Sequence, residues 1–324
     1  MAISTLDATR SEQELLRRGK LVTNKNFQLI LLPTEQCNFR CVYCYEDFAV
    51  GRMKQEVVQG VKALLDRRSL SLHYLNLSWF GGEPLLAKDI ILDVAGHATE
   101  LARKSQFNYS SNITTNGYHL DMTTATALVQ VGVNSYQISL DGPPDVHNRT
   151  RRRADGSGTF ERIWTNLMGL RASSLPVRIM LRVHFSADTC ELLNPLVDAL
   201  RDTFLDDPRF SVFFKGVEHL GGPNDAEIRV LSKAQQAAVI ARLQARLRGG
   251  DSSPVNIHEI GDDYVCYAAR PNSLMIRANG DVGKCTVILN DERNKVATLR
   301  PDGTLALVPG RLGPWVRGIE SLDP

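Results

Sequence analysis

The feature that most constrains the fold is an alternation of short β-like runs with segments of helix length. The runs cover residues 27–32, 72–80, 109–114, 135–140, 177–185 and 210–215. The helix candidates between them include residues 55–68, 89–104, 123–131 and 159–173. In the second candidate, apolar residues from Ile90 to Leu101 recur at helical spacing. This alternation predicts parallel βαβ units in an α/β fold, and right-handed crossovers favour a doubly wound or a barrel-like sheet.

The pattern changes after about residue 220. A strong helix is expected over residues 232–248, with Ser232 as its N-cap. The apolar runs 273–278 and 281–289 then flank Asn279-Gly280, and Asn-Gly between two such runs is the strongest short hairpin signal. We therefore expect a C-terminal β-hairpin appendage that begins near residue 250.

Composition and charge narrow the class of protein. The 324 residues are 43% hydrophobic and carry a formal net charge of +2, so no broad electrostatic attraction to nucleic acid or to a membrane surface is expected. No apolar run approaches the roughly 20 residues that span a bilayer, and the N-terminus lacks the apolar stretch of a secretory signal. These observations predict a cytoplasmic protein.

Three of the six cysteines lie close together, directly after the first expected strand. Cys37, Cys41 and Cys44 have the spacing C-x3-C-x2-C in a polar loop. In a reducing compartment, clustered cysteines are more often metal ligands or catalytic groups than disulfides. A structural zinc site needs four ligands, and no fourth Cys or His lies nearby, although a distant residue could complete one. A [4Fe–4S] cluster held by three cysteines leaves one iron open for a ligand that is not protein.

This spacing, with Tyr43 before the last cysteine, resembles the cluster loop of the radical S-adenosylmethionine (radical SAM) superfamily. The resemblance implies a partial (β/α)6 TIM-like barrel whose first loop binds a [4Fe–4S] cluster through Cys37, Cys41 and Cys44. It also implies that S-adenosylmethionine (SAM) binds the fourth iron, with Tyr43 along its adenine. One-electron cleavage of SAM in that family forms a 5′-deoxyadenosyl radical, which abstracts hydrogen from the substrate.

Two further motifs occur in the order that this family shows. Gly81-Gly82-Glu83 follows the second expected strand, and paired glycines let a backbone approach a ligand closely. The segment Gly81-Gly82-Glu83 is similar to the family's GGE motif, which binds the amino group of SAM, and the resemblance implies that all three residues contact SAM. Asn116, in Thr-Thr-Asn-Gly after the third expected strand, is similar to a segment near the family's reaction centre. In isolation, both motifs are ordinary turn signals.

Ser139 and Arg151 follow the fourth expected strand, and a hydroxyl together with a guanidinium suits a carboxylate. The same pair, twelve residues apart, resembles the one that holds the SAM carboxylate in sulfatase-maturing enzymes and peptide maturases. Asp141 and His147 in this loop are either loop caps or site residues. The remaining cysteine of the barrel, Cys190, is expected to be a buried thiol.

The C-terminal cysteines, Cys266 and Cys285, are expected before the hairpin and on its second strand. Two thiolates brought together in a reducing cell more plausibly share a metal than a disulfide. The pattern resembles the start of a SPASM/twitch extension, which implies a possible auxiliary [4Fe–4S] cluster. Full modules continue with further cysteines, so three readings stay open: the sequence is truncated, the site has an open position, or no cluster binds there. We favour truncation.

The expected domain division follows from these signals. It has an N-terminal segment (1–26), a radical SAM core (27–222) and a linker helix with a SPASM/twitch-like domain (223–324).

The resemblance implies an enzyme that acts on a peptide or protein. Peptide maturases form crosslinks or epimerise residues, whereas sulfatase-maturing enzymes oxidise a Cys or Ser to formylglycine. The latter usually carry Asp directly after the hairpin cysteine, and Thr286 stands there, so we favour peptide maturation. A non-catalytic iron–sulfur electron carrier is the alternative from another class. Expected partners are a peptide or protein substrate, an electron donor such as flavodoxin or ferredoxin, and a separate leader-recognition protein.

Overall fold

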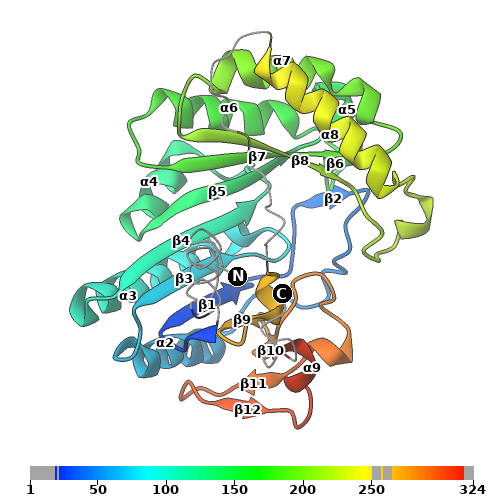
Figure 1. The fold of residues 1–324 in the computed structure, drawn as a ribbon. Helices are drawn as coiled ribbons and strands as arrows, with labels where there is room; N and C mark the ends of the chain where they lie inside the picture. Colours follow the sequence, from blue (N-terminus) through cyan, green and yellow to red (C-terminus); the bar gives the residue numbers. More distant parts are fainter. Residues whose placement is uncertain (1–18, 20–21, 250–256, 258–264, 317–324) are drawn as a thin grey trace, which may run out of the picture.

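A ten-stranded sheet forms the centre of the molecule (Figure 1). The computed structural model describes Gly19, residues 22–249, Ile257 and residues 265–316. The strand order in the sheet is β12-β11-β10-β9-β1-β3-β4-β5-β7-β8. Within the described ranges, no helix is both long and apolar enough to cross a membrane. Most of the expected N-terminal segment (1–26), the expected start of the appendage near residue 250 and residues 317–324 lie outside the described residues.

Six neighbouring strands of this sheet are parallel and form the expected barrel-like part. They are β1 (Asn26–Leu31), β3 (Tyr74–Trp79), β4 (Asn108–Thr115), β5 (Val133–Leu140), β7 (Arg178–Phe185) and β8 (Phe210–Gly216). The helices between them are α2 (Gln55–Ser69), α3 (Lys88–Ser105), α4 (Met122–Gln130), α5 (Pro144–Thr150), α6 (Phe160–Ala172) and α7 (Asn194–Phe204). The predicted α/β class with a partial-barrel sheet is confirmed.

Short elements complete this part of the chain. The 3-10 turns are η1 (Pro84–Ala87), η2 (Cys190–Leu192) and η3 (Asp225–Glu227). The small strands β2 (Phe39–Cys41) and β6 (Arg151–Arg153) pair with each other, antiparallel, outside the main sheet. The expected helix at 232–248 is α8 (Lys233–Arg248), and Ser232 caps it in a capping box with Gln235.

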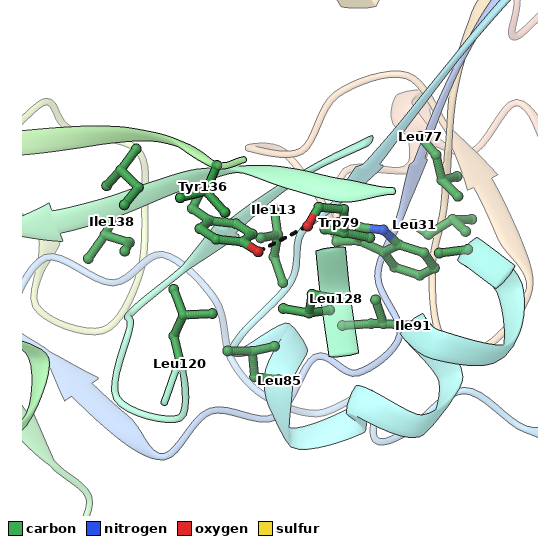
Figure 2. Close-up of a cluster of buried hydrophobic side chains, with 14 of the residues drawn as sticks. Leu31, Leu77, Trp79, Leu85, Ile91, Ile113, Leu120, Leu128, Tyr136 and Ile138 are labelled. Carbon is green, nitrogen blue, oxygen red and sulfur yellow. Dashed lines mark hydrogen bonds between the residues drawn. The ribbon is translucent and has the colours of Figure 1, made fainter. Parts of the chain in front are cut away.

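The two faces of the parallel strands differ in character. On the helix side, apolar side chains such as Leu77, Trp79 and Ile138 are at most 1% exposed and pack against helices α3 and α4 (Figure 2). On the other face, polar side chains such as Asn76 and Asn112 hydrogen-bond across neighbouring strands through serine hydroxyls. Because side chains alternate along a strand, the outer face supplies the core and the inner face is left for polar groups.

The C-terminal elements are joined to the barrel rather than appended to it. They are η4 (Tyr267–Ala269), β9 (Ser273–Ile276), β10 (Asp281–Gly283), η5 (Glu292–Asn294), β11 (Ala297–Leu299), β12 (Leu305–Leu307) and α9 (Gly313–Val316). The expected β9–β10 hairpin is present, but β9 also pairs with β1 in parallel, so one sheet runs across the expected boundary at residue 222. That domain division stays a prediction.

The expectation that Cys285 lies on the second strand of the hairpin is wrong. Strand β10 ends at Gly283. The next two backbone N–H groups, of Lys284 and Cys285, both donate to the side-chain oxygen of Asn294 at 2.9 Å. Because a side chain accepts these two hydrogen bonds, β10 cannot continue its pairing with the neighbouring strands, and Cys285 lies in the loop that follows.

Candidate active site

The three clustered cysteines line one cavity of about 410 Å³ at the carboxyl ends of the parallel strands. Cys41 ends strand β2, and the pairing of β2 with β6 places it opposite Arg151. The Cys44 N–H donates to the Cys41 carbonyl at 3.1 Å, which closes a tight turn between these two cysteines. The Phe39 N–H points at the Cys37 sulfur at 3.3 Å. The loop after β1 therefore presents three thiols to one space, as its spacing predicts.

Burial raises the pKa of all three thiols, to about 12 for Cys44. Neighbouring thiols and carboxylates add to this effect, for example Cys41 acting on Cys37 and on Cys44. The protein alone therefore keeps these groups protonated, and a bound metal centre is what would stabilise them as thiolates. Among the described residues, no three Cys, His, Asp or Glu side chains are gathered around a point that one metal ion could occupy.

The paired glycines let a second loop pack directly on the cysteine loop. A Cβ atom on Gly82 would lie 2.4 Å from the Gln36 carbonyl oxygen, and one on Gly81 would lie 2.3 Å from that of Thr34. Gly81 also has φ +111°, which side chains disfavour. Gly81 and Gly82 both line the cavity. Their contact with SAM stays a prediction, but the close approach of backbone that they permit is present.

Glu83 follows the paired glycines and is buried behind the cavity wall. Its carboxylate is fully buried and does not line the cavity. It accepts hydrogen bonds from the Leu85 N–H (2.9 Å), the Thr115 hydroxyl (2.7 Å) and the Asn116 N–H (2.7 Å). Glu83 therefore joins the ends of β3 and β4 from within, and its predicted contact with the SAM amino group stays a prediction.

Asn116 does face the cavity, beside the cysteine loop. Its side-chain amide donates to the Asn38 side-chain oxygen at 2.8 Å and lies 4.0 Å from the Cys37 sulfur. The β4 end is thereby tied to the cysteine loop. The structure thus places Asn116 next to the first predicted cluster ligand, and its role near a reaction centre stays a prediction.

Ser139 and Arg151 line the same cavity, from β5 and β6. One nitrogen of Arg151 donates to the Tyr43 hydroxyl at 2.7 Å, and its guanidinium lies 5.9 Å from the Phe39 ring centre. Its Nε is buried without a hydrogen-bond partner among the described residues. A hydroxyl and an unsatisfied guanidinium N–H in one cavity fit a carboxylate ligand.

The Tyr43 hydroxyl is held by a buried polar network. It donates to Asp141, whose oxygens lie 2.8 and 3.0 Å away, and its ring packs at 5.3 Å from that of His184. Burial would raise the pKa of Asp141, but hydrogen bonding to His184 and the nearby positive charge of Arg151 lower it to about 2. Burial lowers the pKa of His184 to about 4. Tyr43 lines the cavity, and its predicted position along adenine stays a prediction.

The two undecided residues of the fourth loop have separate roles in the fold. Asp141 belongs to the network around Tyr43, as described above. His147 is fully buried, where its Nδ1 accepts the Asp141 N–H at 3.2 Å and its Nε2 lies 3.1 Å from the Thr159 hydroxyl. His147 is therefore a loop-stabilising residue. Burial accordingly lowers its pKa to about 3.

Sequence reasoning missed several residues of the cavity wall. Arg182 and His184 on β7 and Lys215 on β8 all line it. The available signal was the two-residue period of a strand: Ser139 pairs with Arg182, so both belong to the same face of the sheet. The alternation of polar and apolar residues in these two strands could therefore have identified Arg182, His184 and Lys215 as residues of the inner face.

The C-terminal elements also reach the cavity, through Thr286 and Val287. The Thr286 hydroxyl lies 2.7 Å from that of Tyr267. Cys266 is exposed and Cys285 half-buried. Burial raises the pKa of Tyr267 to about 12, and the charges of Cys285 and Cys266 add to this effect. The structure thus places these two cysteines around one phenol but outside the cavity. Their role as cluster ligands stays a prediction, and Cys190 is buried in η2 as expected.

Comparison with known proteins decides the family. The family model of the radical SAM superfamily matches residues 31–189, the segment that carries the cysteine loop and the strands around the cavity. Residues 31–189 of this chain form a radical SAM domain. Members of that superfamily use a [4Fe–4S] cluster and SAM, which are the two cofactors that the cysteine spacing predicts.

Curated relatives of this radical SAM chain have several activities. A cysteine-type anaerobic sulfatase-maturating enzyme of Clostridium perfringens is 29% identical over 151 residues, which cover 42% of this chain and 38% of that protein. Fe-coproporphyrin III synthase of Methanosarcina barkeri is 30% identical over 146 residues, 45% of this chain and 34% of the relative. PqqA peptide cyclase of Gluconobacter oxydans is 26% identical over 152 residues, 47% and 40% respectively. The radical SAM chain thus matches less than half the length of each of these relatives.

Solved structures confirm the fold over a longer span. The structure of anSMEcpe with bound AdoMet has a TM-score of 0.68 and 19% identity, and covers 90% of this chain and 80% of that one. Streptococcus suis SuiB bound to precursor peptide SuiA has a TM-score of 0.65 and 14% identity, and covers 94% and 70%. Each likeness covers more of this chain than the barrel strands and helices alone, and it shows a shared fold.

Proposed function

We propose that this protein is a radical SAM enzyme that cleaves SAM reductively and modifies a peptide substrate. The observation that carries the first part is the common cavity of Cys37, Cys41, Cys44, Ser139 and Arg151. Three thiols for a cluster and an unsatisfied guanidinium for a carboxylate lie on the same wall, which is the donor set that cluster-bound SAM requires. When bound, the cluster and SAM together supply one-electron reduction and a radical that abstracts hydrogen from the substrate.

The residues of the chain then have distinct roles in this proposal. Cys37, Cys41 and Cys44 bind the cluster, and the close packing at Gly82 holds their loop against the end of β3. Ser139 and Arg151 hold the SAM carboxylate. Arg151 keeps its position because Tyr43 accepts one of its hydrogen bonds while Asp141 accepts from Tyr43.

Two observations support a peptide substrate. PqqA peptide cyclase is among the sequence relatives, and SuiB is a structural neighbour that was solved with its precursor peptide. We favour peptide maturation over formylglycine formation because Thr286, a neutral residue that lines the cavity, stands where sulfatase-maturing enzymes usually carry Asp. An electron donor such as flavodoxin or ferredoxin and a separate leader-recognition protein complete the proposal.

The test of the radical SAM activity is anaerobic reconstitution with iron and sulfide, followed by SAM and reductant. The wild-type protein should form 5′-deoxyadenosine, and Cys41→Ala should form none because one of three cluster ligands is missing. Cys190→Ala is the matched control, since this thiol is buried in η2 and does not line the cavity. Absence of 5′-deoxyadenosine from the reconstituted wild type would refute the proposal.

The peptide substrate is tested separately by mass spectrometry. The reconstituted enzyme is incubated with small peptides encoded beside its gene and with a sulfatase-type peptide that carries a Cys or Ser. A crosslink or an epimerised residue in the first set supports maturation. Conversion of the second to formylglycine, without change in the first, supports the sulfatase alternative instead.

A further inference from the structure

Arg182 places an unpaired positive charge inside the barrel. It lies on β7 and lines the cavity beside the three cysteines. Its Nε is shielded from solvent, and among the described residues it has no hydrogen-bond partner and no carboxylate within ion-pair distance. Many other arginines that the structure describes are in ion pairs, such as Arg229 with Asp188 at 2.8 Å at the surface.

The surroundings of Arg182 explain why no side chain of the barrel neutralises it. Its strand neighbours are Ser139 on β5 and Phe213 on β8, and its guanidinium lies 5.8 Å from the Phe213 ring centre. Glu218 is near enough to act on its charge, but that carboxylate is paired with Lys215 at 2.9 Å. Arg151 adds a second positive charge, and burial lowers the pKa of Arg182.

The Arg182 side chain is half-buried and its Nε is fully shielded from solvent. Shielding a charged donor without a partner is costly, because the loss of hydration is not balanced by a hydrogen bond or by a counter-charge. Chains therefore retain such groups mainly where a ligand completes them. Arg151 and Ser139 already provide for the SAM carboxylate in the function proposed above. Arg182, on the next strand, is a second guanidinium with free donors in the same cavity.

We propose that Arg182 is the binding site for a carboxylate of the peptide substrate, within the barrel and beside the SAM site. A planar guanidinium with free N–H groups can bind a carboxylate through two parallel hydrogen bonds. The carboxylate is either an Asp or Glu side chain or the C-terminus of the peptide. The assignment of this carboxylate to the substrate rests on the proposed function, whereas anion binding at Arg182 does not.

The experiment measures equilibrium binding rather than turnover. Reconstituted full-length protein, saturated with SAM and kept anaerobic, is titrated in a calorimeter with three alanine-based peptides. The first is blocked at both ends with a central Glu, the second is its Gln counterpart, and the third has no acidic side chain but a free C-terminal carboxylate. The wild type should bind the Glu peptide, the free-carboxylate peptide or both about 10- to 100-fold more tightly than the Gln peptide.

The variant Arg182→Gln should lose this preference, and Arg182→Lys should retain part of it. Arg178→Gln is the matched control, because Arg178 begins the same strand but is exposed and does not line the cavity. Whichever of the two acidic peptides shows the preference identifies the source of the carboxylate.

Three outcomes would overturn the proposal: no binding of either acidic peptide to the wild type, equal affinity for acidic and neutral peptides, or a preference that survives in Arg182→Gln. A loss of SAM affinity in Arg182→Gln with the peptide preference intact would assign Arg182 to SAM instead. If the wild type shows the preference but forms no 5′-deoxyadenosine, the proposed function fails and the anion site stands.

Discussion

Replacing Arg277 with Met should destabilise the protein through the cysteine loop, 242 residues away in sequence. The Arg277 guanidinium lies in the turn between β9 and β10 and makes a two-point ion pair with Glu35, two residues before Cys37. Its Nε donates to one carboxylate oxygen at 3.0 Å and its Nη2 to the other at 2.5 Å. Its remaining nitrogen donates to the Leu289 carbonyl at 2.8 Å. The pair thus connects the C-terminal elements to the loop that presents the cysteines.

Burial determines the size of the effect. Glu35 is 2% exposed and Arg277 is 8% exposed. Removing one partner of a buried ion pair leaves the other charge without compensation and costs about 3–5 kcal/mol. After the replacement, Glu35 keeps only the Ala278 N–H at 3.4 Å within the part of the C-terminal segment that the structure describes. We therefore expect Arg277→Met to lower the free energy of unfolding by about 3–5 kcal/mol.

The assay is urea unfolding of the cluster-free protein at pH 7, followed by circular dichroism. A double-mutant cycle with Glu35→Gln isolates the pair, and the double variant should be more stable than the sum of the single losses predicts. Lys62→Met is the matched control, since its ion pair with Asp93 is largely exposed and is worth less than about 1 kcal/mol. The reasoning is refuted if Arg277→Met behaves like this control or if the cycle is additive.

Two further predictions concern Gly82 and His147. Gly82→Ala should reduce the iron content of the reconstituted protein, because its Cβ would meet the Gln36 carbonyl oxygen at 2.4 Å. Gly96→Ala in α3, whose Cβ would have an ordinary contact at 3.6 Å, should retain full iron, and equal iron in both variants would contradict the argument. The pKa of His147 is lowered by burial from 6.5 to about 3, so the unfolded chain binds a proton that the folded chain does not. The contribution of His147 to stability is therefore complete above pH 6.5 and should fall by roughly 2 kcal/mol between pH 6.5 and 5 in urea titrations. His147→Gln should remove this part of the pH dependence and leave the part that comes from His184, whose pKa burial also lowers.

The strands and helices of the barrel could be predicted because their signals are local. The six expected strands lie within two residues of β1, β3, β4, β5, β7 and β8, since apolar residues at fixed spacing form the outer face that packs on the helices. The Ser232 cap and the Asn279-Gly280 turn are equally local, and both are present.

The end of β10 and the position of Glu83 could not be predicted in this way. Asn294 ends the strand by capturing two backbone donors, and nothing in the Asp281–Leu289 run marks that event. Glu83 is turned into the protein because the Leu85 N–H of η1 and two donors at the end of β4 lie around its carboxylate. In each case the decisive partner comes from another element.

The sequence by itself determined the α/β alternation and the spacing of three cysteines, and through their resemblance to a known family it indicated the [4Fe–4S] cluster and SAM. The tertiary structure alone decided that β9 joins the barrel beside β1, that Arg277 reaches the cysteine loop, and that Arg182 stands unpaired beside Ser139. The reason is physical: periodicity and spacing depend on neighbours along the chain. Burial and charge compensation depend instead on residues that only folding brings together.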